Sequence, residues 1–584
     1  MKRNSRKEVY RQFRWRAWLV MSVFALASVA IIGRALQLQV LDTEFLERQA
    51  DARHLRVITL SAHRGLILDR NGETLAASTP VDSVWADPPA LARATNRINE
   101  LAKILERSPE NLLRQITSNL DREFIFLRRH MSPERAAAVM DLDIPGVYLQ
   151  REYRRYYPAG EVTGHLLGFT DIDDRGQEGL ELAYDQWLVG EPGAKRVIKD
   201  RLGRVIGDVE SIRPARPGKD LVSSIDLRIQ YLAYRELKAA VQRYRARSGS
   251  VVVMDITSGE VLAMVNQPSY NPNDRSQFSA SRYRNRAVTD IFEPGSSFKP
   301  LVIAAALESG QYTPHSRIDT SPGYVTVPGK TIEDTKNLGI IGIGTILAKS
   351  SNVGAAKVAL SLEAEYLFGI ISRFGIGRLT TSGFPGESAG LLNDYSHWRE
   401  IGQATLAYGY GLSLTPLQLA QAYAVLAADG IRRPVSLLRT DAPEAGERVI
   451  TPETAIAVVD MLERVVSTGG TGRKAAVPGY RVAGKTGTSW KFQAGGYSTD
   501  RYIAVFAGLA PATHPRLAVV ILIDEPSGEK YYGGDVAAPV FSAVMSGALR
   551  YLAVPPDALT PYRPEPGAIV QARVQPAATA ARAR

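Results

Sequence analysis

The sequence predicts a mixed α/β (α+β) protein with one transmembrane helix, an extended N-terminal pedestal domain and a larger domain. The larger domain is expected to hold an antiparallel five-stranded sheet covered by helices. Three observations predict this fold. An uncharged stretch follows a basic N-terminus, β-rich runs occur at both ends of residues 221–552, and the chain between those runs is mostly helical. With 584 residues, 45% of them hydrophobic, the chain has room for several globular domains.

Residues 1–16 form a basic segment, and residues 17–40 are predicted to span a membrane. Ala17–Gly33 carries no charge, and the apolar pattern continues past Arg34, which can extend its charged end toward the interface. The basic flank predicts a cytoplasmic N-terminus with the bulk of the chain on the other side. A signal peptide cleaved near Ala25–Ala27 is the alternative, but the apolar run continues beyond that site. Because no second long apolar stretch appears, we expect a single-pass protein.

Composition argues against several classes of function. The formal net charge is +11, but much of the excess lies in the N-terminus and the C-terminal tail, so we expect no nucleic-acid partner. The chain has no cysteine, which excludes disulfides, thiolate metal sites and a cysteine nucleophile. The seven histidines show no paired spacing typical of metal ligands. We therefore expect no metal and no cofactor.

Residues 41–220 form the predicted pedestal domain, an extended and polar module. Ser61–Ala76 is typical of strand, turn and strand, because Asn71-Gly72 is a strong hairpin signal. Residues 95–142 are expected to form helices joined by loops, and residues 154–181 loops and short strands. Since no acid–base constellation converges here, a spacer or docking role is favoured over a second catalytic site.

Residues 221–552 form the larger predicted domain. Two β-rich runs joined by a hairpin begin it, and three more come late in the chain. The predicted strands are Ser250–Ile256, Val261–Val265, Val482–Thr488, Tyr502–Leu509 and Leu517–Ile523. The predicted helices include residues 299–308, 342–360 and 415–428, with a closing helix at 536–552. Residues 553–584 are rich in Pro, Ala and Arg and are expected to be disordered.

Ser296 and Lys299 form the first candidate site, because residues three apart share one face of a helix. Pro294-Gly295 marks a turn and an apolar run follows Pro300, so Ser296 is expected near the N-terminus of a buried helix. A serine hydroxyl becomes a good nucleophile when a base takes its proton. A lysine can be that base when burial or another cation lowers its pKa. A serine and a lysine at this spacing also arise by chance in long chains, so the assignment of a nucleophile and its base needs support from further motifs.

Two further motifs follow downstream. Ser350 and Asn352, two residues apart at the end of a helical run, can face one cleft. Lys485, Thr486, Gly487 and Thr488 lie on a β-rich run. There the lysine would supply a fixed cation and the threonines would supply hydroxyl donors suited to a carboxylate. Glycine on this run would leave room for another backbone alongside it.

Gly479–Thr486 also matches the phosphate-binding loop pattern G-x-x-x-x-G-K-[ST]. That loop requires a strand before its first glycine and a helix after its lysine. Here Gly487-Thr488 follows the lysine, and a helix starting there is disfavoured. We therefore reject the nucleotide-binding interpretation.

The three motifs occur together in the order and approximate spacing of the penicillin-binding proteins and serine β-lactamases, which the chain resembles. Arg64–Gly72 and Tyr157–Glu181 resemble the pedestal of class B penicillin-binding proteins. Lys349–Gly354, Tyr408–Gly411 and Tyr531–Gly534 look like the FtsI-like, division-specific branch of that class. The resemblance covers nearly the whole chain except the tail.

This resemblance implies a peptidoglycan D,D-transpeptidase that cross-links stem peptides ending in D-Ala-D-Ala at the division septum and is inhibited by β-lactams. By the same resemblance, Ser296 would attack the donor and form an acyl-enzyme, with Lys299 as the base. Ser350 would relay the proton to the leaving D-alanine, and Asn352 would hold the donor. Lys485 would help to bind the terminal carboxylate.

The resemblance also implies substrate-binding residues. Thr486, Gly487 and Thr488 would line the donor, with the threonines contacting its carboxylate. The backbone N–H groups of the nucleophile and of Thr488 would form an oxyanion hole. Tyr410 and Tyr531 are expected to wall the site. No metal or cofactor is implied.

The resemblance places the protein in a bacterial inner membrane, with a periplasmic catalytic domain. It implies an FtsW-like glycan polymerase and other divisome proteins as partners. Three alternatives remain: an elongation-specific class B transpeptidase, a non-catalytic β-lactam sensor or scaffold, and a β-lactamase. A sensor would be expected to lack a motif residue or to carry more membrane spans. A β-lactamase is usually shorter and secreted, which the anchor and the long pedestal argue against.

Overall fold

The computed structural model describes residues 5–42, 55–60, 62–199, 205–274, 276, 279–493 and 496–558. The chain divides into two compact units. The first comprises Met1–Leu66, Ala77–Tyr156 and Gln186–Asp220, and the second comprises Ile67–Ala76, Tyr157–Asp185 and Leu221–Arg584. The sequence predicted one boundary near residue 220, whereas two segments of the predicted pedestal group with the second unit. The tail was predicted to be disordered from residue 553, which is wrong for residues 553–558: Val554 packs against the core of the second unit, and Asp557 accepts a 2.7 Å hydrogen bond from the N–H of Arg481. The tail beyond residue 558 lies outside the described residues.

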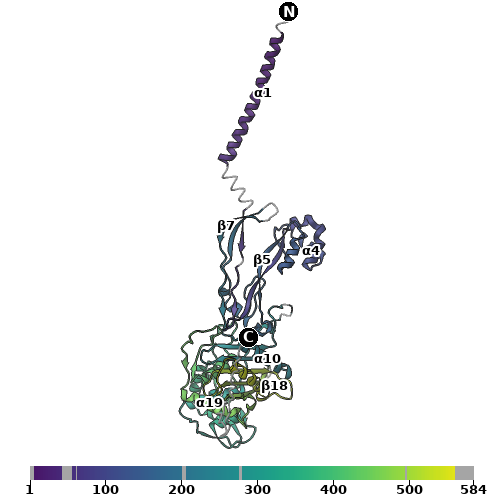
Figure 1. Ribbon diagram of the computed structural model, residues 1–584. Helices are drawn as coiled ribbons and strands as arrows, with labels where there is room; N and C mark the ends of the chain where they lie inside the picture. The colour runs from purple at the N-terminus through teal and green to yellow at the C-terminus, as the bar shows by residue number, and fades with distance from the viewer. Residues whose placement is uncertain are drawn as a thin grey trace, which may run out of the picture. The chain divides into compact units, whose positions relative to one another are not determined.

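The N-terminal segment is one long helix, α1 (Ser5–Leu36), followed by a π-helical turn, η1 (Gln37–Leu41) (Figure 1). Within it, Arg14–Val40 is long and apolar enough to cross a membrane, and none of its most apolar part is buried inside the protein. A helix that is apolar on every side and is not buried by any of the described residues suits the interior of a lipid bilayer. The predicted span, residues 17–40, lies within this stretch.

The first unit contains two groups of antiparallel strands and a small helical cluster. β6 (Gly193–Lys199) lies between β1 (Leu55–Leu60) and β7 (Val205–Arg213). β3 (Thr74–Ala86) pairs with β4 (Ile125–Met131) and β5 (Val147–Tyr156). The helical elements are α3 (Pro88–Leu91), η2 (Ala92–Arg97), α4 (Ile98–Leu105), α5 (Pro109–Thr117) and α6 (Pro133–Met140). Their apolar side chains share one core with Val84 and Leu127.

Strand β4 was missed by the sequence analysis, which expected only helices and loops in residues 95–142. Its apolar run, Ile125–Leu127, is only three residues long and is followed by basic side chains. The strand is stabilised by partners remote in sequence. It pairs with β3, and Arg129 forms a 2.6 Å ion pair with Glu152 of β5. Pairing with distant segments cannot be detected from the local pattern of apolar residues.

The second unit is built on the predicted antiparallel five-stranded sheet, in the order β10-β9-β19-β18-β17. The strands are β9 (Ser248–Asp255), β10 (Val261–Gln267), β17 (Ala483–Gln493), β18 (Gly496–Ala510) and β19 (Leu517–Asp524). All five predicted strands are therefore confirmed. The first two strands and the last three come from opposite ends of the domain. Strand β17, which carries the third motif, lies at the edge.

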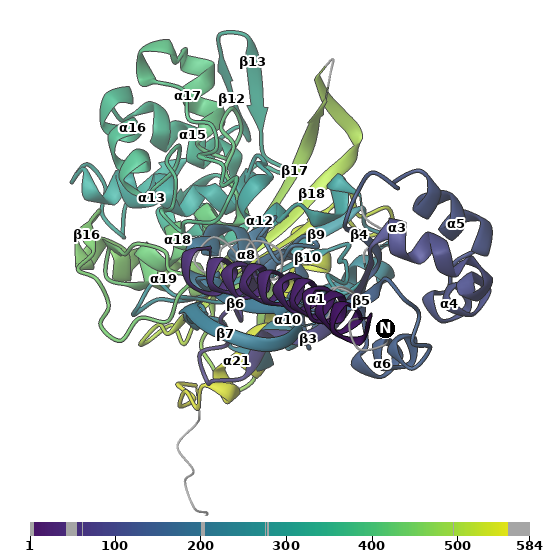
Figure 2. The same ribbon diagram turned by 90° about the horizontal axis from the view of Figure 1, so that it is seen from above.

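Helices cover both faces of this sheet, as Figure 2 shows. α10 (Leu227–Arg243) and α21 (Ala538–Tyr551) pack on one face and share a core with side chains such as Val253, Phe506 and Ile521. α18 (Pro416–Ala427) packs against β9, β18 and β19 from the other face. Because strand side chains alternate between faces, both faces must be apolar, and every residue of β9 is buried.

The second unit contains further helices, most of which lie between the two groups of strands in sequence. Its longer helices are α13 (Lys299–Glu308), α14 (Ile343–Lys349), α15 (Asn352–Leu360), α16 (Ala364–Arg373), α17 (Glu400–Leu406) and α19 (Pro452–Val466). Shorter ones are η3 (Gly160–Val162), α7 (Gly164–Leu167), α8 (Gly179–Ala183), α11 (Ala280–Tyr283), α12 (Arg286–Thr289), η4 (Gly295–Phe298), η5 (Tyr395–His397), η6 (Arg473–Ala475) and α20 (Gly533–Val536).

Short strands also form two-stranded pairs in this unit. They are β11 (Arg317–Asp319) with β14 (Ile340–Gly342), β12 (Tyr324–Val327) with β13 (Lys330–Glu333), and β15 (Ile431–Arg432) with β16 (Glu447–Arg448). β2 (Ile67–Leu68) pairs antiparallel with the start of β3 and parallel with β8 (Leu221–Val222). The β12–β13 hairpin was not predicted.

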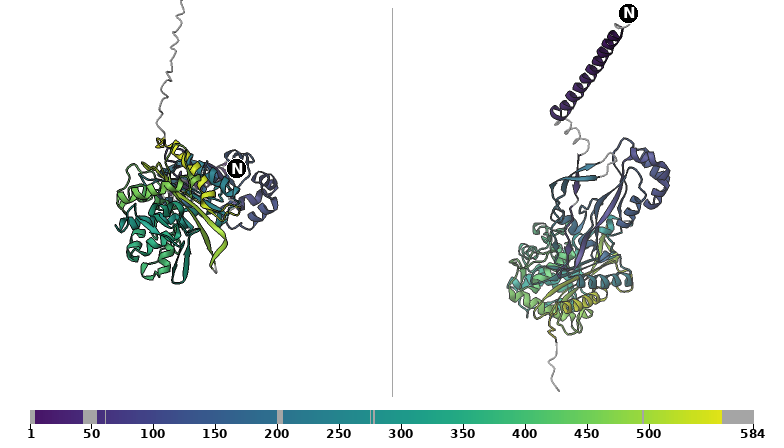
Figure 3. Two further views of the ribbon diagram at one scale, coloured as in Figure 1. Left: turned by 90° about the horizontal axis from the view of Figure 1, so that it is seen from below. Right: turned by 45° about the horizontal axis from the view of Figure 1, so that its top comes forward.

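Two predicted elements differ from the structure. The expected helix 342–360 is two helices, α14 and α15, separated at Ser350, whose φ of +60° is left-handed. The strands expected at 482–488 and 502–509 are longer, and β17 and β18 form a hairpin that extends well beyond the other strands (Figures 2 and 3). Aromatic contacts between strands support this extension, such as Phe492 against Tyr497 with ring centroids 5.4 Å apart.

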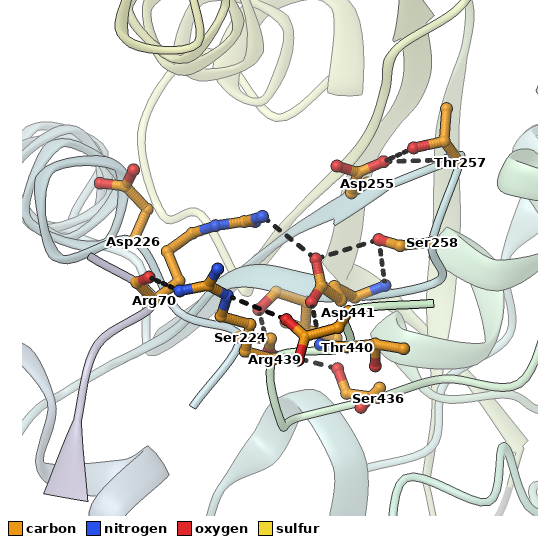
Figure 4. A network of polar contacts seen from close by, with 12 residues as sticks. Arg70, Ser224, Asp226, Asp255, Thr257, Ser258, Ser436, Arg439, Thr440 and Asp441 are labelled. Atoms are coloured by element: carbon orange, nitrogen blue, oxygen red, sulfur yellow. Dashed lines mark hydrogen bonds and ion pairs between the residues drawn. The ribbon is translucent and has the colours of Figure 1, made fainter. Parts of the chain in front are cut away.

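A buried polar network ties the hairpin segment 67–76 to the rest of the second unit (Figure 4). Arg70 forms a 3.3 Å ion pair with Glu260, which is only 2% exposed. Glu260 also accepts a 2.7 Å hydrogen bond from the backbone N–H of Thr440. Arg439 donates to the backbone carbonyl of Arg70 at 3.1 Å. A buried carboxylate is stable only with such partners, so this network fixes the segment in place.

Candidate active site

Ser296 lies in the short 3₁₀ turn η4, directly before helix α13. Gly295 supplies the left-handed conformation that opens this turn, with φ of +56°. The turn is held from two sides: Ser297 Oγ donates to the carbonyl of Pro294 at 2.7 Å, and Tyr423 donates to the carbonyl of Ser297 at 2.8 Å. The serine hydroxyl is therefore presented by a fixed backbone.

Lys299 begins α13, and its side chain is fully buried. Its Nζ lies 3.0 Å from Ser296 Oγ, which is hydrogen-bonding distance. The same Nζ donates to the carbonyl of Ser350 at 2.6 Å and to Asn352 Oδ1 at 2.8 Å. The predicted nucleophile and base are thus in contact, and the second motif orients the base.

Ser350 joins the two lysines of the site. Its left-handed backbone ends α14, and Ser351 then caps α15 by accepting a hydrogen bond from the N–H of Gly354 at 2.9 Å. This break points Ser350 Oγ to within 3.2 Å of Lys299 Nζ and 3.0 Å of Lys485 Nζ. A single hydroxyl can therefore exchange a proton with either amine.

Lys485 lies on the edge strand β17, not at a helix start, which agrees with the rejection of the phosphate-loop interpretation. Its buried Nζ donates to the carbonyl of Thr486 at 3.1 Å. Thr488 Oγ1 accepts from the N–H of Gly533 at 3.0 Å. Gly487 has no space for a side chain, because a Cβ there would lie 2.7 Å from the carbonyl of Pro294. The strand therefore packs directly on the nucleophile turn.

One cleft of about 680 Å³ is lined by Ser296, Ser350, Asn352, Thr486 and Thr488 among others. Most of its lining residues are polar or charged. The lining residues are Ser296, Glu333, Asp334, Thr335, Lys336, Leu338, Lys349, Ser350, Ser351, Asn352, Thr471, Arg473, Lys474, Thr486, Thr488, Tyr532, Gly534 and Asp535. In the described residues, no group of three or more His, Cys, Asp or Glu side chains is arranged to hold a metal.

Comparison with known proteins assigns the chain to a family. Residues 249–546 match the penicillin binding protein transpeptidase domain, and residues 59–223 match the penicillin-binding protein dimerisation domain. The chain is 44% identical over 551 residues to the peptidoglycan D,D-transpeptidase FtsI of Escherichia coli K12, covering 94% of this chain and 93% of that protein. This chain is a class B penicillin-binding protein.

Solved structures agree with that assignment. The transpeptidase domain of penicillin-binding protein 3 from Burkholderia pseudomallei is 42% identical with a TM-score of 0.54, covering 58% of this chain and 98% of that one. A peptidoglycan synthetase from Bifidobacterium adolescentis is 25% identical with a TM-score of 0.69, covering 87% of this chain and 98% of that one. As a member of this family, the protein is a serine-type transpeptidase anchored by a single N-terminal span.

The electrostatics of this penicillin-binding protein favour a neutral base. Burial lowers the pKa of Lys299 well below its usual value, and the nearby Lys485 lowers it further, while Asp334 acts in the opposite direction. Burial also lowers the pKa of Lys485 to about 7. Two buried ammonium groups that share one hydroxyl disfavour each other, so one of them is neutral near neutral pH.

The structure brings together all five predicted catalytic residues, namely Ser296, Lys299, Ser350, Asn352 and Lys485. Thr486 and Thr488 line the cleft as expected, whereas Gly487 packs on the nucleophile turn. Two predicted wall residues, Tyr410 and Tyr531, are not among the residues that line the cleft. Tyr410 accepts a 3.2 Å hydrogen bond from the N–H of Trp490, and Tyr531 stacks on Tyr502 with centroids 4.2 Å apart. Tyr532, beside Tyr531, lines the cleft instead.

Asp334 is a cleft residue that the sequence analysis missed. It accepts hydrogen bonds from Ser351 Oγ and from the backbone N–H groups of Asn352 and Val353. The carboxylate therefore caps α15 and fixes Asn352, which contacts the base. Asp334 follows a short polar hairpin with no motif around it, so sequence offered no signal for this role.

Proposed function

We propose that this transpeptidase cross-links peptidoglycan stem peptides at the division septum, with Ser296 as the residue that carries the acyl group. The observation that supports the nucleophile most directly is the 3.0 Å distance between Ser296 Oγ and the buried Nζ of Lys299. Burial and the neighbouring Lys485 both lower the pKa of Lys299, so its amine is available as a base.

The first half-reaction forms the acyl-enzyme. Neutral Lys299 accepts the proton of Ser296, and Oγ attacks the carbonyl carbon of the bond between the two terminal D-alanines. The resulting oxyanion is held by the backbone N–H groups of Ser296 and Thr488, each a contribution of about 3 kcal/mol in comparable enzymes. Ser350, in contact with both lysines, passes a proton to the leaving nitrogen as the C–N bond breaks.

The second half-reaction transfers the acyl group. The amine of a neighbouring stem attacks the ester carbon and gives a proton back to the Lys299–Ser350 pair, and Ser296 leaves with its hydroxyl restored. Lys485, Thr486 and Thr488 hold the terminal carboxylate of the donor, since a buried cation and two hydroxyls suit that group. β-Lactams would enter the same reaction and remain on Ser296.

The septal role rests on the FtsI relatives and on the FtsI-like motifs of the chain. We propose a cytoplasmic N-terminus, a periplasmic catalytic domain, and a partnership with an FtsW-like glycan polymerase and other divisome proteins. The basic residues before the apolar helix favour this orientation. Depletion of the protein should produce filaments if it acts at the septum, whereas rounded cells would indicate the elongation-specific role.

The test of the nucleophile is intact-mass spectrometry of the detergent-solubilised full chain after incubation with benzylpenicillin. We expect one stable adduct on the wild type and none on Ser296→Ala. Rapid hydrolysis of the drug without a lasting adduct would indicate a β-lactamase. Neither adduct nor hydrolysis would contradict the acyl-transfer proposal and favour the scaffold alternative.

A further inference from the structure

Glu293, three residues before Ser296, contacts three separate parts of the second unit. Its Oε1 accepts a 2.8 Å hydrogen bond from the N–H of Gly411 and a 3.0 Å hydrogen bond from the hydroxyl of Tyr497 on β18. Its backbone carbonyl accepts a 2.8 Å hydrogen bond from Ser489 Oγ on β17. One residue thus connects the loop 408–411, the β17–β18 hairpin and the backbone that leads to the nucleophile.

The loop 408–411 and the hairpin also contact each other and the turn that carries Ser296 through further hydrogen bonds. The N–H of Gly295 donates to the carbonyl of Gly409 at 3.2 Å. A Cβ on Gly409 would lie 2.1 Å from the carbonyl of Gly295, so the loop and the turn are in direct contact. Loop and hairpin also touch each other: the N–H of Trp490 donates to Tyr410, whose ring lies 5.4 Å from that of Tyr497. The position of the turn therefore depends on both neighbours.

Burying the carboxyl group of Glu293 at this position reduces the stability of the folded protein. Its Oε2 is buried and has no hydrogen-bond partner among the described residues. Burial raises the pKa of Glu293, against the opposing effects of the Gly411 N–H, the Tyr497 hydroxyl and Lys330. A buried, half-satisfied acid reduces stability, so a role in positioning rather than in folding explains its presence.

We propose that Glu293 is a positioning residue that couples the β17–β18 hairpin and the loop 408–411 to the turn that presents Ser296. It does not touch the reacting atoms. It holds the backbone on which Ser296 Oγ is placed against Lys299, and it transmits any displacement of the hairpin to that turn. This inference rests on the proposed function, in which Ser296 is the nucleophile.

The test is the rate of acylation of the full chain by nitrocefin or benzylpenicillin in stopped-flow, separated into the binding constant and the rate constant of acylation. Glu293→Ala should lower the acylation rate constant about 10- to 100-fold, because small displacements of reacting groups have effects of that size, and should leave binding nearly unchanged. Glu293→Gln keeps an oxygen for Gly411 and Tyr497 and should restore most of the rate.

Tyr497→Phe provides a second, milder variant, because it removes only the hydroxyl that donates to Glu293 and keeps the ring. It should lower the acylation rate constant about 3- to 10-fold, the effect of one hydrogen bond, and should add little to Glu293→Ala in the double variant. The matched control is Ser498→Ala, which removes a hydroxyl from the same hairpin that bonds only within it.

Three outcomes would overturn the coupling. They are unchanged acylation in Glu293→Ala, equal losses in Glu293→Gln and Glu293→Ala, or full additivity with Tyr497→Phe. If Glu293→Ala does not fold, the Gln and Phe variants still decide the question. A wild type that forms no adduct at all would instead contradict the proposed function, so the two failures are distinguishable.

Discussion

At the scale of single residues, the two buried lysines give the site a defined dependence on pH. Lys299 must be neutral to act as base, so acylation should be lost as pH falls through its lowered pKa. Lys485 must be charged to attract the donor carboxylate, and its pKa is lowered to about 7. In the free enzyme that attraction should be lost as pH rises through about 7.

We therefore predict a bell-shaped pH profile for the second-order rate constant of acylation. The alkaline limb should move to higher pH for the first-order rate constant at saturating β-lactam, because a bound carboxylate raises the pKa of Lys485. Stopped-flow acylation between about pH 5 and pH 9 measures both constants. A flat profile, or an alkaline limb that does not move, would contradict these assignments.

Asp334 supports a second residue-scale prediction. Asp334→Asn removes the charge that caps α15 and holds Asn352, so we expect a loss of about 1 kcal/mol in the free energy of unfolding. Acylation should also slow about tenfold, because Asn352 orients the base. Urea unfolding and stopped-flow acylation measure the two effects.

The matched control for Asp334 is Asp394→Asn. Asp394 caps the short helix η5 through the N–H of Ser396 and does not line the cleft. It should affect stability without slowing acylation. Equal acylation rates in the two variants would show that Asp334 has no influence on the base.

At the scale of elements, the contact between the edge strand and the nucleophile turn decides where Ser296 lies. Gly487→Ala would place a Cβ 2.7 Å from the carbonyl of Pro294, and backbone cannot give way as a flexible side chain can. Strand and turn must separate, so we expect acylation to fall about 100-fold, with the penicillin adduct forming slowly or not at all. Intact-mass spectrometry against time checks this.

Gly528→Ala is the control for Gly487→Ala, because a Cβ on Gly528 meets no atom within 4 Å. Its adduct should form at the wild-type rate. Wild-type kinetics in Gly487→Ala would show that the strand can move away from the turn without cost, contrary to the packing described above.

At the scale of the whole molecule, the second unit is not continuous in sequence. The segments 67–76 and 157–185 belong to it, and they are tied in by contacts such as the Arg70–Glu260 ion pair and the 3.0 Å hydrogen bond from the N–H of Tyr157 to Asn273. A fragment that starts at residue 221 therefore leaves Glu260 buried without its cation, which is destabilising.

We predict that a fragment of residues 221–558 unfolds at a midpoint at least about 3 °C below that of residues 62–558, since roughly 2 kcal/mol shifts the midpoint of a domain of this size by that amount. Differential scanning calorimetry measures the midpoints. Penicillin adduct formation on both fragments verifies that each holds a folded site. Equal midpoints would show that the two segments contribute nothing to the stability of the unit.

Much of this architecture follows from local sequence. The single span, the five strands of the central sheet and the three motifs depend on properties that short segments carry by themselves: uninterrupted apolarity, β-rich composition and residue types at short spacings. Ser296 and Lys299 share a turn because they are three residues apart, and the Pro294-Gly295 pair marks that turn. None of these features depends on which distant segments of the chain contact one another.

The tertiary structure alone decided the remaining features, because each depends on segments far apart in the chain. Lys485 meets Ser350 only once an edge strand packs on a helical break, and the left-handed backbone of Ser350 divides a helix that local propensity made continuous. Asp334 gains its role from a helix start that follows it, and strand β4 depends on partners in β3 and β5. Packing brings such groups together at distances and burials that no local pattern encodes, and with them it sets the pKa of the base.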